Sequence, residues 1–181
     1  MSAALRLFVA LDLPSAARTA LARFRDDAAD PTIWRLLPEA SLHVTLAFLG
    51  HRPPEDVDRI AGALDRLAPW DPPQLALGDA LLLPPRRARV LTVALADRTG
   101  ELGALQAEVA ARLIAAGVYE AETRPFRPHV TVARLRSGAR SPRALERVPE
   151  TVEFRAGAVT LYRSVLGRGG SVYDALLARP G

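Results

Sequence analysis

Short apolar runs alternate along the chain with segments in which apolar residues recur every three or four positions. The runs predict half-buried strands and the wider spacing predicts helices that pack on one face. Residues 5–11 and 41–48 form the first two strands, the second stopped by Gly50. A helix begins at Pro14 between them, and a second follows Pro53 and Pro54 and ends before residues 69–73. The apolar stripes are Ala17, Leu21, Phe24 and Ala28 in the first helix and Val57, Ile60, Leu64 and Leu67 in the second.

The same order of elements then recurs. We expect a strand, or two short ones, over residues 75–83, a turn over 84–89, a strand over 90–96, a helix over 99–116 and a strand over 128–135. A short helical piece over 142–147 and strands over 152–162 and 171–178 complete the chain. Local echoes support a duplication, since Val9-Ala10-Leu11 recurs 84 residues later as Val93-Ala94-Leu95. The fold class predicted is α+β, with two duplicated lobes, each an antiparallel-rich sheet with helices on its outer face, within one domain spanning residues 1–181.

Two matched tetrads stand inside apolar runs of the two halves. They are His43-Val44-Thr45-Leu46 and His129-Val130-Thr131-Val132, and they hold two of the three histidines in the chain, 86 positions apart. Residues two apart on a strand point to the same face. Each tetrad therefore presents an imidazole beside a hydroxyl while its apolar residues face a core. Two such strands facing a central cleft predict one symmetric site.

Composition removes several classes of chemistry. The chain has no Cys, which excludes disulfides, thiolate nucleophiles and Cys-ligated zinc. All 24 basic residues are Arg, so a Schiff-base lysine, a lysyl-nucleotidyl intermediate and the lysine of a Walker phosphate loop are excluded too. The net charge of +4 favours an anionic partner. No run has the length of a membrane span or of the apolar part of a signal peptide, so we expect a cytoplasmic protein.

Two histidines that flank a cleft suit a reaction in which one group takes a proton and another gives one. Two threonine hydroxyls and an arginine can hold the non-bridging oxygens of a phosphodiester, where charge builds up in the transition state. Arg127, two residues before His129, is the arginine expected to share the cleft face. No metal is predicted, because threonine is a poor ligand and two histidines lack the third ligand usual in catalytic zinc.

The other candidate residues are expected to be structural. His51 is predicted to be a solvated turn residue, and Arg134 to face away from His129 by strand parity. Trp34 and Phe126 could stack on a base, but core packing is the better expectation for both. The arginine runs, predicted to be solvated surface rather than a border of the cleft, are Arg86, Arg87 and Arg89 in one and Arg134, Arg136, Arg140, Arg143 and Arg147 in the other.

The motifs resemble those of the two-histidine (2H) phosphoesterases, and among them the LigT-like bacterial RNA 2′,3′-cyclic phosphodiesterases, historically called 2′-5′ RNA ligases. The resemblance covers nearly the whole chain. It is carried by the opening at residues 6–14, the motif strands at 42–50 and 126–134, and the ending at 161–176. The second motif has Val132 where leucine is commoner.

The resemblance implies metal-independent hydrolysis of RNA 2′,3′-cyclic phosphate ends to 2′-phosphomonoesters, without a cofactor. It implies that His43 is the proton donor to the departing 3′ oxygen and His129 the base that activates water. Thr45 and Thr131 would bind the phosphate. Spacing alone does not decide which histidine is the acid. The family is also associated with 2′-5′ RNA ligation, the same chemistry reversed.

Two alternatives stay open on the sequence alone. One is a related activity on a small cyclic phosphate, such as an ADP-ribose cyclic phosphate or a cyclic nucleotide. The other is a non-catalytic RNA-binding module that uses the arginine-rich surface, for which binding is salt-sensitive and indifferent to the chemistry of the RNA end. The partners expected for the enzyme are RNA ends with a 2′,3′-cyclic phosphate, tRNA fragments among them, and the protein is expected to be a monomer.

Overall fold

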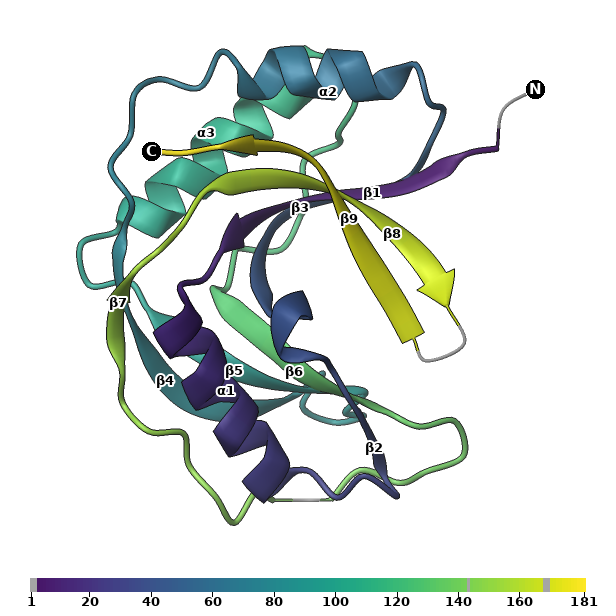
Figure 1. The fold of residues 1–181 in the computed structure, drawn as a ribbon, viewed down its shortest axis with the longest axis vertical. Helices are drawn as coiled ribbons and strands as arrows, with labels where there is room; N and C mark the ends of the chain where they lie inside the picture. The colour runs from purple at the N-terminus through teal and green to yellow at the C-terminus, as the bar shows by residue number, and fades with distance from the viewer. Residues whose placement is uncertain (1–2, 143, 168–169) are drawn as a thin grey trace.

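A computed structural model describes residues 3–142, 144–167 and 170–181 as one curled, mostly antiparallel sheet with three α-helices (Figure 1). The strands follow the order β7-β4-β5-β6-β3-β1-β8-β9, and β2 pairs with β6. Their bounds are β1 Leu5–Asp12, β2 Trp34–Leu36, β3 His43–Arg52, β4 Gln74–Leu83, β5 Val90–Ala96, β6 His129–Leu135, β7 Glu153–Arg155, β8 Val159–Gly167 and β9 Gly170–Arg179. The predicted α+β class with an antiparallel-rich arrangement is confirmed.

The two halves of the sheet exchange strands. β1 and β3 come from the first half of the chain, but their half of the sheet is completed by β8 and β9 from its end. β5 and β6 come from the second half of the chain, and β4 from the first half extends them. The halves meet where β3 pairs with β6 at Val44 and Val130. The two motif strands are therefore neighbours in one continuous sheet, and the candidate site lies over their seam.

The helices cross between the halves in the same way. Helix α1 (Ser15–Ala28) contacts β6 and β7, while α3 (Glu101–Ala115) contacts β3 and packs beside α2 (Asp56–Leu64). Their apolar stripes join those of the strands in a single hydrophobic cluster. Val44, Leu46, Val130 and Val132 are buried in this cluster, as the tetrad pattern predicts. Their burial leaves the histidines and threonines on the opposite face. Among the described residues, no helix is long and apolar enough to cross a membrane.

Both motif strands carry a β-bulge at the same place. Against β1, the partners of Val9 and Ala10 are Ala47 and Thr45, so Leu46 is the extra residue. Against β5, the partners of Leu91 and Thr92 are Ala133 and Thr131, so Val132 is the extra residue. A bulge leaves one residue unpaired and reverses the alternation of side chains beyond it. Phe48 and Arg134 thereby return to the face that carries the histidines.

The carbonyl of each bulged residue accepts a hydrogen bond from outside the ladder. The Gln106 side chain of α3 donates to the Leu46 carbonyl at 3.2 Å. The backbone N–H of Leu37, just after β2, donates to the Val132 carbonyl at 2.9 Å. Buried backbone groups need such partners, so these two bonds stabilise the bulges.

The expected elements are largely confirmed, with four differences. The predicted helical piece over 142–147 is absent from its described residues, which are irregular; Arg143 lies outside the described part. The single strand predicted over 152–162 is divided into β7 and β8. Gly50 does not stop β3, because its positive φ of 73° allows a second bulge and the strand continues to Arg52. Strand β2 and the 3₁₀ turn Glu39–Ser41 were not predicted, since three-residue elements carry no periodicity.

Candidate active site

The four polar side chains of the tetrads converge on one pocket. His43 and Thr45 reach it from β3, and His129 and Thr131 from β6. Because the strands run antiparallel and meet at Val44 and Val130, each histidine lies beside the threonine of the other tetrad. The predicted convergence of the two tetrads is therefore present. The residues that complete the pocket are Leu37, Arg134 and Tyr173.

The two imidazoles are held in the same way. His43 Nδ1 lies 2.8 Å from the Ser41 carbonyl, and His129 Nδ1 lies 2.7 Å from the Arg127 carbonyl. A carbonyl oxygen can only accept, so Nδ1 carries the hydrogen in both rings. Nε2 is then left as the atom that can accept or donate a proton. The arrangement presents two equivalent proton-transfer atoms to the pocket.

The surroundings of His43 are mainly aromatic. Its ring stacks on Phe8 at a centroid distance of 4.8 Å and meets Tyr173 edge-on at 5.3 Å. Burial, with smaller contributions from Arg134 and His129, lowers the pKa of His43 from 6.5 to about 4. The hydrogen bond to Ser41 and the charge of Asp12 act in the opposite direction. The free protein therefore favours a neutral His43 at pH 7.

Asp12 sits opposite His43 on the neighbouring strand β1. Its two carboxylate oxygens accept hydrogen bonds from the hydroxyls of Thr160 at 2.7 Å and Tyr162 at 2.8 Å. Burial and the bond to Asp12 raise the pKa of Tyr162 to about 12, so this phenol stays protonated and remains a donor. These two bonds hold the Asp12 carboxylate in place on the strand next to His43.

Arg134 was predicted to face away from the histidines, and that prediction is wrong. The residue lines the same pocket as both histidines. The parity argument assumed a regular strand, but the bulge at Val132 reverses the alternation before Arg134. The two consecutive small apolar residues Val132 and Ala133, both buried, are the only trace of the bulge in the sequence.

Arg127 differs from the expectation in its placement. Strand β6 begins at His129, so Arg127 precedes it, exposed and separated from it by Pro128. Its carbonyl holds His129, whereas its side chain is not among those that line the described pocket. The arginine that lines the pocket is Arg134 and not Arg127. A phosphate contact from the Arg127 guanidinium stays a prediction without support from the pocket.

The remaining predicted residues fall as follows. His51 is exposed, at the far end of β3. Trp34 is buried and Phe126 packs half-buried against the core, which confirms core packing for both. The described members of the arginine runs are exposed, and of these only Arg134 lines the pocket. Leu37 and Tyr173 were not assigned to the site, because they lie in segments without a motif that only the fold brings to it.

The fold and the paired tetrads define a phosphoesterase of the two-histidine class. The model of the 2′-5′ RNA ligase superfamily matches residues 13–168, and the chain belongs to this family. Within the described residues, no group of three or more His, Cys, Asp and Glu side chains is placed to hold a metal ion.

Two curated relatives and one solved structure illustrate the similarity. The chain is 30% identical over 178 residues to an RNA 2′,3′-cyclic phosphodiesterase of Geobacillus stearothermophilus, covering 96% of this chain and 56% of that one. It is 31% identical over 194 residues to a Thermus thermophilus protein of the same name, with 95% and 88% covered. The chain thus spans little more than half of the first relative and most of the second. The crystal structure of Escherichia coli LigT with 3′-AMP superposes with a TM-score of 0.81 at 28% identity, with 98% of each chain covered.

Proposed function

We propose that this protein hydrolyses the 2′,3′-cyclic phosphate at an RNA end to a 2′-phosphomonoester, without a metal ion. The observation that carries the proposal is the matched pair of imidazoles, each with Nδ1 bound to a carbonyl and Nε2 available at a pocket with two threonines and an arginine. The names of the curated relatives support this substrate. LigT, whose crystal structure was solved in complex with 3′-AMP, supports a nucleotide ligand.

In the proposed reaction, His129 Nε2 takes a proton from a water molecule as its oxygen attacks phosphorus. The bond between phosphorus and O3′ breaks, and His43 Nε2–H donates its proton to O3′. The products are a 2′-phosphate and a 3′-hydroxyl. The hydroxyls of Thr45 and Thr131 and the Arg134 guanidinium hold the non-bridging oxygens, where negative charge increases in the transition state. The same sequence with a 5′-hydroxyl end in place of water, whose oxygen attacks phosphorus as the bond to O3′ breaks, gives a 2′-5′ linkage and a 3′-hydroxyl.

The assignment of His43 as proton donor requires it to be charged in the complex. In the free protein its lowered pKa of about 4 favours the neutral form. A bound phosphodiester brings a negative charge next to Nε2, which raises the pKa of the imidazole again. We therefore infer that His43 is mostly neutral in the free protein at neutral pH, and that it gains the proton it must donate as the substrate binds.

The test is turnover of an oligoribonucleotide that ends in a 2′,3′-cyclic phosphate, in the presence of excess EDTA. We expect conversion to the 2′-phosphate by the wild type, and a loss of about 10²- to 10⁴-fold in His43→Ala and in His129→Ala. His51→Ala, which removes the third, exposed histidine, is the matched control and should keep turnover. Loss of activity on adding EDTA, or a well-folded wild type without turnover, contradicts the proposal.

A small cyclic phosphate remains the second candidate, because the pocket over the seam is small and LigT has also been crystallised with NADP⁺. Comparing a cyclic-ended oligonucleotide with cyclic mononucleotides and an ADP-ribose cyclic phosphate separates the two. A strong preference for one of the small compounds favours the second candidate. RNA binding that ignores the chemistry of the 3′ end, without turnover, favours a binding module.

A further inference from the structure

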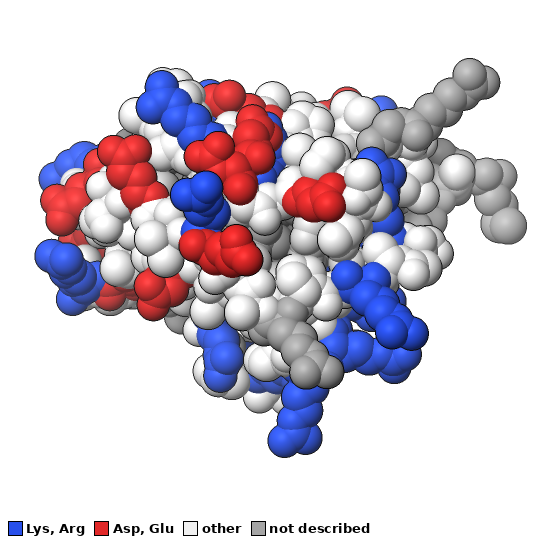
Figure 2. Space-filling model, turned by 90° about the horizontal axis from the view of Figure 1, so that it is seen from below, with Lys and Arg blue, Asp and Glu red and all other residues white. Residues whose placement is uncertain are grey.

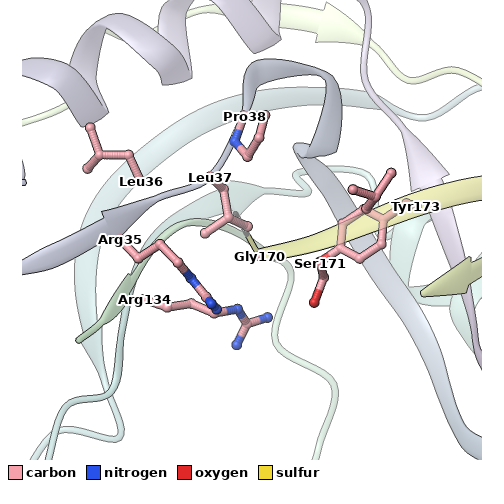
Figure 3. A pocket seen from close by; sticks show the side chains of 9 residues that line it. Arg35, Leu36, Leu37, Pro38, Arg134, Gly170, Ser171 and Tyr173 are labelled. Carbon is pink, nitrogen blue, oxygen red and sulfur yellow. The ribbon is translucent and has the colours of Figure 1, made fainter. Parts of the chain in front are cut away.

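A second, larger cavity opens directly beside the histidine pocket (Figure 3). The two share Leu37, Arg134 and Tyr173. One wall of the second cavity comes from residues 35–38, and the other from residues 170–173 of β9. In Figure 3 the side chains of Arg35 and Arg134 lie side by side in it, opposite Ser171 and Tyr173. The packing of the cavity does not explain why two arginines lie together in it.

Arg35 and Arg134 are directly paired residues of β2 and β6. Like charges opposite each other in a sheet destabilise the pairing. Neither guanidinium forms an ion pair or hydrogen bond with any described residue, although described arginines elsewhere, such as Arg163 with Asp174, do. The Arg35 side chain instead lies along the backbone of Gly170. A Cβ added to Gly170 would be 3.8 Å from Cδ, Nε and Cζ of Arg35. An anion between the two guanidinium groups would remove their repulsion.

We propose that Arg35 binds the phosphodiester that links the terminal nucleotide of the RNA to its 5′ neighbour. This inference rests on the proposed function. Arg134 belongs to both cavities and so stands between the cyclic phosphate and the second anion. A 2′,3′-cyclic phosphate ends its strand, so the nearest other phosphate of that strand can only be on the 5′ side. The second cavity then favours a nucleic-acid end over a mononucleoside substrate.

The distribution of charge on the surface agrees with a polyanionic strand. Figure 2 shows acidic and basic side chains intermixed over one part of the face, while basic side chains alone project along its opposite edge. An edge that carries basic side chains alone attracts the phosphates of a nucleic-acid strand that passes it.

Three substrates with the same terminal nucleoside test the assignment. They are adenosine 2′,3′-cyclic phosphate, the dinucleotide that carries one further nucleoside on its 5′ side, and this dinucleotide with an uncharged methylphosphonate linkage. We expect the wild type to have the highest kcat/KM for the charged dinucleotide. In Arg35→Gln this advantage should fall by about 3- to 10-fold, the range for one charge-assisted contact at a partly exposed site. Arg35→Lys, which keeps the charge, should retain most of it.

Arg66→Gln is the matched control, since Arg66 is exposed beyond α2 and lines neither cavity. It should keep the wild-type preference. Equal kcat/KM values for the three substrates in the wild type, or an equal loss on all three in Arg35→Gln, would overturn the second phosphate contact while leaving the proposed function intact. A wild type that hydrolyses none of the three overturns the proposed function, and this inference with it.

Discussion

At the scale of single residues, the two histidines are alike in their anchoring and different in their surroundings. Each ring is fixed by a carbonyl two positions earlier in the chain. His43, however, lies against Phe8 and Tyr173, and the loss of hydration there lowers its pKa to about 4. The same backbone contact therefore holds two imidazoles that differ in their surroundings.

This shift makes stability depend on pH in a defined window. Between about pH 6.5 and 4, an unfolded chain binds a proton at His43 that the folded protein does not. The free energy of unfolding should therefore fall as the pH is lowered from 6.5 to 4. Well above pH 6.5, the titration of His43 should make no contribution to its pH dependence. We expect His43→Gln to show a smaller fall in urea unfolding over this window. Parallel pH curves for the two proteins would contradict the shift.

The hydroxyls of the tetrads can be tested by two substitutions that separate the hydroxyl from the methyl group. Thr131→Val keeps the shape and removes the hydroxyl, and Thr131→Ser keeps the hydroxyl and removes a methyl group. If the hydroxyl holds a phosphate oxygen, Thr131→Val should lose about 1.5–3 kcal/mol of transition-state binding, or roughly 10- to 100-fold in kcat/KM. Thr131→Ser should stay close to the wild type. Equal losses in the two variants would indicate that packing matters at this position and the hydroxyl does not.

At the scale of elements, the bulges decide which residues reach the site. The tetrads were predictable because both residues of interest, as at His43 and Thr45, precede the bulge and obey the alternation of a regular strand. Arg134 was not, because the alternation reverses at Val132. The longer strands and helices were predictable from periodicity. The partner of each strand was not, since pairing between β1 and β8 depends on contacts more than 140 residues apart.

The bond from α3 to the bulge in β3 gives a prediction about this element. Gln106→Leu leaves the Leu46 carbonyl without its donor, which costs about 1–3 kcal/mol for a buried unsatisfied group. Unfolding by urea should show a loss in this range. Turnover should fall as well, because Thr45 directly precedes the bulged residue.

Gln74→Leu provides the matched control for this change. Gln74 is the other glutamine of the chain and is exposed at the start of β4, and its side chain forms none of the described side-chain hydrogen bonds. It should unfold at nearly the wild-type urea concentration. If both variants lose the same stability, the side-chain bond to the bulge contributes nothing specific.

At the scale of the whole molecule, the exchange of strands makes each half depend on the other. A cut in the exposed turn at residues 84–89 separates β4 from β5, its partner in the sheet, and β1 from β8. A protease site placed there should yield two fragments that stay together, with the circular dichroism of the intact chain. Each fragment purified alone in denaturant should fail to regain that spectrum, and mixing the two should restore it. Independent refolding of either fragment would contradict this.

The same exchange has a consequence for the division of labour between the histidines. Suppose that such a unit, with a strand, a helix, a motif strand and a further strand that pairs in the other half of the sheet, were a separate chain. It could complete the sheet only by pairing with a second copy of itself. In such a two-fold symmetric pair, neither imidazole could be told from the other, and acid and base would be interchangeable. Here both units lie in one chain, and the equivalent positions after the bulges hold Phe48 in one and Arg134 in the other. Because both units belong to one chain, a residue in one unit can differ from its equivalent in the other. A nearly symmetric fold can then hold one histidine as the acid and the other as the base.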